Sequence, residues 1–202
     1  MFGIKRGGKE KQPAAEPAGE YLTARLNARV QPIDRGEYYE DPLDETMTTL
    51  GIGEVTGGGT QLADEPAGIE FCDLEIRVNE SSPETLAAIV KRLEDLGAPK
   101  GSKLIPDGDG REIVFGQYEG IGVFLNGTDL PEAVYNECDV NHVIERFNQL
   151  LAENGAFRGY WQGSRETALY CYGPSFATMK AALEPFLASY PLCERARIEQ
   201  IA

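Results

Sequence analysis

The chain has 202 residues, 42% of them hydrophobic, and 33 acidic residues against 19 basic ones give it a formal net charge of −14 at pH 7. These values are typical of a globular protein with one or two domains. A negative field of this size repels phosphate backbones, so we expect no direct binding to nucleic acid. No apolar run approaches the ~20 residues that span a bilayer, and we expect neither a membrane contact nor a secretory signal.

Residues 1–20 are expected to form a disordered N-terminal tail. The stretch from Glu10 to Gly19 is rich in Pro, Ala and Glu, a composition that cannot bury enough apolar surface to fold. The first ordered element is therefore predicted to begin near Tyr21.

The cysteines and the single histidine, His142, do not form a recognisable metal motif. Cysteine occurs at four scattered positions, none spaced as CxxC: Cys72, Cys138, Cys171 and Cys193. A structural zinc site needs clustered ligands, so we expect no metal and no cofactor. Reduced, mostly buried thiols are typical of a cytoplasmic protein, which is the location we predict.

The first half of the chain is predicted to run strand, helix, strand, strand, helix, strand. Alternating polar and apolar residues indicate a half-buried strand at 21–30. Gly51 and Gly97 are placed to end the two helices, and Pro83 to begin the second. The six elements are expected at 21–30, 41–50, 53–62, 69–78, 83–96 and 103–105.

The second half is predicted to repeat that order. Two short strand-like segments lie within 112–125, around Gly120, and a helix with apolar residues at i, i+3, i+4 and i+7 follows Asp139. A hairpin turns around 163–165, and Ser175 is placed to cap a second helix. After 112–125 the elements are expected at 140–153, 156–162, 167–172, 175–187 and 195–201.

The matched order predicts an α+β fold, a tandem duplication of a split β-α-β (ferredoxin-like) unit. Each antiparallel sheet would carry two helices on one face. The first half would cover 21–106 and the second 111–202, with Asp107-Gly-Asp-Gly110 as the turn between them. The two open sheet faces could pack together or form a groove between the halves, and the sequence does not choose between these arrangements.

An acidic run with two tyrosines inside it is the first candidate for a partner-binding site. Exposed tyrosines flanked by carboxylates suit a basic protein surface. The alternative is a solvated loop and helix N-terminus, where carboxylates are favoured in any case. The candidate residues are Asp34, Glu37, Tyr38, Tyr39, Glu40, Asp41, Asp44 and Glu45.

The predicted hairpin is the second candidate. Simple alternation would place Tyr160, Tyr170 and Tyr172 together on the open face, with Leu169 and Cys171 facing the helices. That aromatic face would either pack on the other half or bind a partner. The candidate residues are Arg158, Tyr160, Gln162, Arg165, Tyr170 and Tyr172.

A triple glycine suggests an alternative, ligand-binding site at Thr56, Gly57, Gly58, Gly59 and Thr60. A phosphate-binding loop would need a lysine and a following helix, and here the run continues into strand-like sequence. Glycines within a strand more often mark a bulge or a close backbone approach. Both interpretations stay open, and no residue is predicted to be catalytic.

Several strings resemble a group of uncharacterised bacterial cytosolic proteins, some of which are similar to immunity proteins of polymorphic toxin systems. The resemblance is carried by Gly53–Thr60, Ala98–Lys103, Asn126–Pro131 with Cys138–Val140, and Tyr160–Gly163 with Glu166–Tyr170. It implies a protein partner, such as a toxin domain with a basic surface, and no catalytic residues.

The sequence therefore predicts an acidic intracellular binding protein. The resemblance implies more specifically an immunity protein. The alternative is a small-ligand-binding or regulatory protein that uses a groove between the halves. An enzyme is the least expected outcome, because no complete catalytic motif is present.

Overall fold

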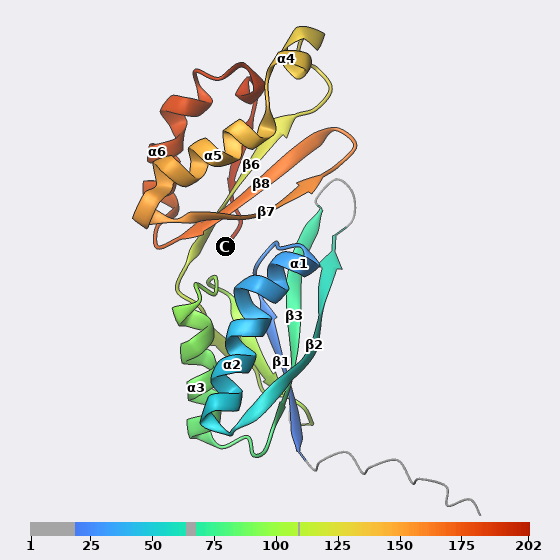
Figure 1. Cartoon of the computed structure of the whole chain (residues 1–202), viewed down its shortest axis with the longest axis vertical. Helices are drawn as coiled ribbons and strands as arrows, with labels where there is room; N and C mark the ends of the chain where they lie inside the picture. The colour runs from blue at the N-terminus through green and yellow to red at the C-terminus, as the bar shows by residue number, and fades with distance from the viewer. Residues whose placement is uncertain (1–18, 64–67, 109) are drawn as a thin grey trace, which may run out of the picture.

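The structure is a computed structural model that describes residues 19–63, 68–108 and 110–202. Most of the predicted tail and of the turn at 63–68 lies outside these residues. The two halves follow one another along the longest axis of the molecule (Figure 1). Among the described residues, no helix combines the length and the apolar character needed to cross a bilayer.

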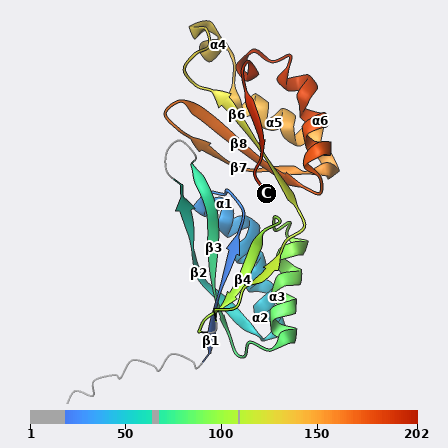
Figure 2. The ribbon, with the colours of Figure 1, turned by 180° about the vertical axis from the view of Figure 1, so that it is seen from behind.

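The first half is a five-stranded sheet covered on one face by helices. Its strands are antiparallel and follow the order β2-β3-β1-β4-β5. In the reverse view the strands lie in front of the helices (Figure 2). The strands are β1 (Glu20–Leu26), β2 (Gly53–Leu62), β3 (Ile69–Val78), β4 (Ser102–Pro106) and β5 (Ile113–Phe115), and the helices are α1 (Pro32–Arg35), a π-helical turn (Gly36–Glu40), α2 (Asp41–Leu50) and α3 (Pro83–Asp95).

The second half is a four-stranded antiparallel sheet in the order β7-β8-β6-β9. Helices α5 and α6 pack on one face of it. The strands are β6 (Glu119–Asn126), β7 (Ala156–Gln162), β8 (Glu166–Gly173) and β9 (Arg197–Gln200); the helices are α4 (Glu132–Glu137), α5 (Val140–Leu151) and α6 (Phe176–Leu187), with 3₁₀ turns at Ala152–Asn154 and Pro191–Cys193.

The two halves share one topology, which confirms the predicted fold class. In each half the first and third strands are central, the second strand lies beside the third, and the fourth lies beside the first. The first and second strands are therefore parallel but separated by the third, which is the split β-α-β arrangement. The added strand β5 and the added helix α4 are the main departures from the repeat.

Strand β5 belongs to the first sheet, not to the second half where we expected it. Its residues pair with β4, Lys103 lying opposite Val114. The chain then turns at Gly116, whose φ of +100° and close approach to the Pro99 carbonyl leave no room for a side chain. The change from one sheet to the other thus falls between Phe115 and Glu119, later than the predicted boundary at 106–110.

Alternation along the strands separates the two faces of each sheet. In the first half Leu22, Ala24 and Leu26 of β1 are buried under the helices. In the second half Leu169 and Cys171 of β8 join the core beneath α5 and α6. These are the faces that the period-two pattern predicts.

The open face of the second sheet packs on the end of the first half. Tyr170, Tyr172, Phe124 and Ala168 belong to the same buried cluster as Ala28 and Val30, which follow β1. The Tyr172 hydroxyl accepts a hydrogen bond from the Arg29 backbone N–H, with an N···O distance of 2.7 Å. The sheets therefore do not meet face to face; the second sheet covers the end of the first half.

Candidate functional site

One long helix carries the acidic run. The α1 helix, the π-helical turn and α2 follow without a break from Pro32 to Leu50. The proline lies in the first turn, where its missing N–H costs nothing. We predicted a helix only from Asp41. Because the helix begins earlier, at Pro32, the acidic residues after Gly36 lie inside it and not at its N-terminus.

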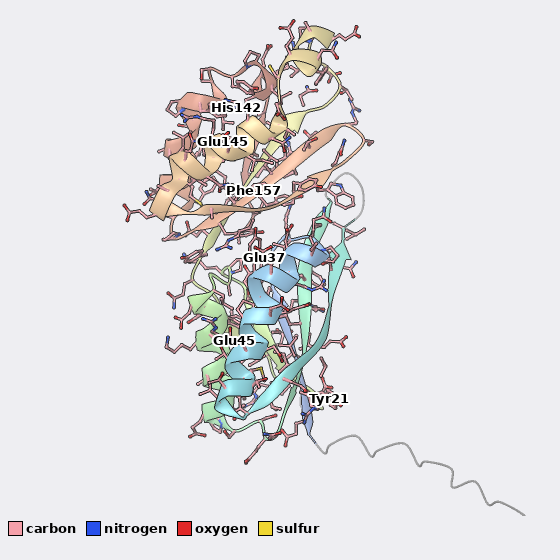
Figure 3. The ribbon with its side chains drawn as sticks, viewed as in Figure 1. Tyr21, Glu37, Glu45, His142, Glu145 and Phe157 are labelled. Carbon is pink, nitrogen blue, oxygen red and sulfur yellow. The ribbon has the colours of Figure 1, made fainter. Side chains whose placement is uncertain are left out.

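The exposed and buried positions of this helix fall on opposite sides. Arg35, Tyr39, Leu43 and Met47 are buried at intervals of four residues. Glu37, Asp41 and Glu45 are exposed, and half-buried Asp34 precedes them by one turn. Figure 3 labels Glu37 and Glu45 on this helix. We call Asp34, Glu37, Asp41 and Glu45 the acidic helix face.

Three residues predicted to bind a partner support the fold instead. Tyr39 is 1% exposed, and burial raises the pKa of its hydroxyl well above the ordinary value. Glu40 Oε1 pairs with Arg35 Nε at 2.5 Å. Asp44 Oδ1 accepts a hydrogen bond from the Val55 backbone N–H at 2.8 Å, which ties the helix to β2.

Tyr38 lies beside the hairpin of the second half. The Arg158 guanidinium carbon is 4.5 Å from the centroid of the Tyr38 ring, a cation–π arrangement. Burial, the Asp34 charge and the Glu37 charge act against ionisation of Tyr38, and its pKa is raised. Two of the predicted site residues, one from each half, are thus brought together at the end of the acidic helix face.

No basic residue follows Arg35 in the stretch of sequence that carries Glu37, Asp41 and Glu45. Between Gly36 and Ile76 the chain contains eleven Asp or Glu and no Lys, Arg or His, so this stretch alone carries a formal charge of −11. Among the described residues, Glu37, Asp41 and Glu45 make no ion pair. The pKa of Asp34 is raised, first by burial and then by the charge of Glu37. The carboxylates therefore repel one another and remain available to an external cation.

The triple glycine is explained mainly by packing. A Cβ on Gly58 would lie 2.5 Å from the Asp73 carbonyl oxygen and 2.9 Å from Arg35 Nε. Gly58 therefore lets the Arg35–Glu40 pair lie close against β2, and Thr60 Oγ1 accepts a further bond from Arg35 at 2.8 Å. Gly59 meets nothing within 4 Å, and a register shift at Thr56 bulges the strand.

A β-bulge changes the faces of the hairpin residues. The register of β7 against β8 shifts between Phe157 and Gly159, so that Tyr160 pairs with Leu169 and Trp161 with Ala168. Our prediction that Tyr160 shares a face with Tyr170 and Tyr172 was therefore wrong, because the extra residue reverses the alternation. It is Trp161 that packs in the core shared by the two halves.

The other hairpin residues divide between interior and surface. Tyr170 and Tyr172 are 0% and 2% exposed, so an external partner cannot reach them, and the alternative that the aromatic face packs on the other half is the one the structure adopts. Tyr160 is 45% exposed, and Gln162 and Arg165 are exposed. Only these three and half-buried Arg158 remain available at the surface.

Two residues that close the contact between halves were not singled out from the sequence. The Arg29 guanidinium carbon lies 5.6 Å from the Tyr170 ring centroid. Gln31 Nε2 donates to the Tyr160 carbonyl at 3.0 Å. Gln31 immediately precedes the proline that begins α1, and this helix-start pattern was the available signal.

No metal-binding cluster occurs in the part of the chain that the structure describes. It contains no group of three or more His, Cys, Asp or Glu residues placed to hold a metal ion. His142 is exposed and lies against Tyr190, with ring centroids 5.2 Å apart. All four cysteines are free thiols.

Comparisons with known proteins do not identify a family. No family model and no curated protein matches the sequence. Similar solved structures include an unknown protein from Galdieria sulphuraria (10% identity, 90% of this chain and 96% of that chain, TM-score 0.28). A second is the first two RRM domains of the yeast poly(U)-binding protein Pub1, with 10% identity over 91% of this chain and 99% of that chain and a TM-score of 0.25. A third is a candidate monooxygenase from Lactobacillus acidophilus, with 12% identity over 90% of this chain and 92% of that chain and a TM-score of 0.30. With TM-scores this low, these similarities carry no conclusion about function.

Proposed function

We propose that this chain is a binding protein that docks a basic protein surface through its acidic helix face. The observation that carries the proposal is the row of exposed carboxylates Glu37, Asp41 and Glu45 on a helix that starts at Pro32. Carboxylates stabilise a helix in its first turn, but these residues lie beyond that turn, where the helix dipole does not favour them.

The cost of this arrangement favours a functional explanation. Like charges four residues apart on a helix destabilise it by about 0.2–0.5 kcal/mol per pair. Glu37 with Asp41, and Asp41 with Glu45, are two such pairs, and no basic residue follows on the helix to offset them. A basic partner would relieve the repulsion on binding, and the long-range field would accelerate its approach.

The resemblance noted from the sequence narrows the class of partner. An immunity protein neutralises its toxin by direct binding, and a toxin domain with a basic surface is the partner this proposal names. Half-buried Tyr38 at the end of the acidic helix face and exposed Tyr160 on the hairpin would act as anchors. The same carboxylates repel nucleic acid, so the proposed partner is a protein.

The proposal is tested by capture of partners with matched charge variants. One bait carries Glu37→Lys, Asp41→Lys and Glu45→Lys. The control carries Glu137→Lys, Glu145→Lys and Glu153→Lys, exposed positions in the second half that change the net charge by the same amount. Figure 3 shows Glu145 on α5, away from the helix that carries Glu37 and Glu45.

We expect wild type and control to retain the same basic protein from a host lysate at low salt, and the first variant to lose it. Equal retention by all three baits would contradict the proposal, as would retention of nucleic acid alone. Mass spectrometry of the retained proteins gives the readout.

A further inference from the structure

A small cavity opens at the loop end of the second sheet. Its volume is about 370 Å³, which falls at the lower end of the range for small-molecule sites, roughly 300–1,000 Å³. Its walls come from the turn after β6, the β7–β8 loop and the start of β9. The lining residues are Asn126, Thr128, Asp129, Arg165, Glu166, Arg195 and Arg197.

The lining of this cavity carries a small positive charge, although the chain as a whole is strongly acidic. Residues 119–202 contain six basic residues in all, and three of them, Arg165, Arg195 and Arg197, line this cavity. Against them stand two lining carboxylates, Asp129 and Glu166, which leaves a formal charge of +1. Two more carboxylates, Glu194 and Glu199, pair with Arg195 and Arg197 from outside the lining, so the feature of this cavity that suits an anion is its group of three arginines and not its net charge.

Arg197 lines the cavity and is held by two carboxylates and an aromatic ring. Its guanidinium pairs with Glu166 Oε2 at 2.9 Å and with Glu199, and it lies 4.0 Å from the centroid of the Phe124 ring. Glu166 is therefore neutralised within the protein. Arg197 fixes the shape of the site, and the other two arginines are left to meet a ligand.

Arg165 and Arg195 have unused donors. Within the described residues, the Arg165 side chain makes no ion pair and no hydrogen bond. Arg195 makes only long contacts, 3.4 Å from Nη1 to the Asp129 carbonyl and 3.7 Å from Nε to the Glu194 carboxylate. A guanidinium carries five N–H donors in a planar fork that matches an oxyanion.

The backbone of Arg195 is strained at this site. Its φ is +62°, a value that glycine adopts freely and that costs a residue with a side chain. Ala152 is the only other described non-glycine residue with a positive φ. Strain of this kind persists where surrounding structure enforces it, and it is concentrated at functional sites. Here it holds an arginine at the mouth of a cavity.

We propose that this cavity binds a small molecule through a single phosphate or carboxylate group, held between Arg165 and Arg195. The Thr128 hydroxyl and the Asn126 side chain line the same space and offer further polar contacts. The charge of Asp129 limits the site to ligands with few negative charges. This site is independent of the acidic helix face and lies in the other half of the chain.

The test is a titration of the ¹⁵N-labelled full chain with inorganic phosphate and, separately, with acetate, followed by NMR. We expect saturable shifts of the Arg165 and Arg195 Nε–H signals with at least one probe, at a Kd below about 10 mM. Comparison of the two Kd values shows whether phosphate or carboxylate is the preferred group. Arg165→Ala combined with Arg195→Gly should abolish the remaining shifts around Thr128, and Arg146→Ala on α5 should leave them unchanged. The absence of saturable shifts with both probes would overturn the proposal, as would shifts that survive in the double variant.

The strained residue gives a second readout that does not depend on a ligand. Arg195→Gly should raise the Tm of the unliganded chain by about 2–4 °C, because glycine accepts a positive φ without strain. Ala152→Gly should also raise the Tm, while leaving anion binding intact. A lower Tm for Arg195→Gly would show that the arginine is not held under strain and would overturn that part of the proposal.

Discussion

The hydroxyl of Tyr172 in the second half accepts a hydrogen bond from the backbone N–H of Arg29 in the first, at 2.7 Å. Tyr172 is 2% exposed, and Gly159 on the neighbouring strand lies against the Arg29 carbonyl. This contact seals the open face of the second sheet onto the end of the first half. It makes the two repeats one body around a shared core.

Tyr172→Phe should destabilise the protein by about 1–3 kcal/mol, because the Arg29 N–H would be left without its partner inside the shared core. Denaturant unfolding followed by Trp161 fluorescence measures the change, since Trp161 packs in the same core. Tyr190→Phe is the matched control: its hydroxyl accepts from the Asp139 backbone N–H at 3.0 Å, but at an exposed position, and we expect a change within about 0.5 kcal/mol. Equal effects of the two substitutions would show that burial of the Tyr172 contact does not increase its contribution to stability.

Gly58→Ala should destabilise the fold by about 1–3 kcal/mol, because the added Cβ would be forced against the Asp73 carbonyl and Arg35. Gly59→Ala, one residue along the same strand, meets nothing within 4 Å and should change the stability by less than about 0.5 kcal/mol. Thermal unfolding of the two variants provides the comparison. Equal stability of the two variants would contradict the packing described for Gly58.

Cys138 should be the one thiol that reacts readily in the native protein. It is half-buried, while Cys72, Cys171 and Cys193 are buried. Burial raises the pKa of Cys72 to about 12 and that of Cys193 to about 12, so little reactive thiolate forms at neutral pH. Mass spectrometry after brief treatment with N-ethylmaleimide should find one label, and four after denaturation. Rapid labelling of Cys72 would contradict the packing described for the first half.

Glu119 should contribute stability that is lost in acid. The Lys100 amino group and then the Phe176 backbone N–H donate hydrogen bonds to its carboxylate and lower its pKa. Its folded pKa lies below the ordinary value of about 4.3, so its contribution is complete above that pH and disappears as the pH falls through the folded pKa. Unfolding of wild type and Glu119→Gln across this range should show a difference that shrinks toward low pH. A difference independent of pH would refute this role.

Local patterns predicted the repeated fold because the sequence of each half contains the same order of strand and helix signals. The predicted bounds of β2 and β3, 53–62 and 69–78, are those observed. Glycine stops and alternation are local signals, and two copies of the same order reinforce one another. The membership of β5 in the first sheet depends on pairing with β4, a long-range choice that no local pattern records.

The candidate site was harder to predict for two physical reasons. Burial of Tyr39 and pairing of Glu40 with Arg35 depend on what packs against the helix, which the acidic run does not reveal. The bulge at Arg158 exchanges the faces of Tyr160 and Trp161, and one inserted residue is enough to reverse a pattern of period two. The start of the helix at Pro32, in contrast, could have been predicted from the proline itself.

The central claim is that the acidic helix face contacts a basic partner, and the association rate constant tests it most directly. It should be measured with the captured partner at low and at physiological salt for wild type, for the Glu37, Asp41 and Glu45 reversal, and for the Glu137, Glu145 and Glu153 control. We predict that the first variant associates at least about tenfold more slowly at low salt, that the gap narrows as salt screens the charges, and that the control loses far less. Equal losses in both variants, or no loss in either, would contradict the account.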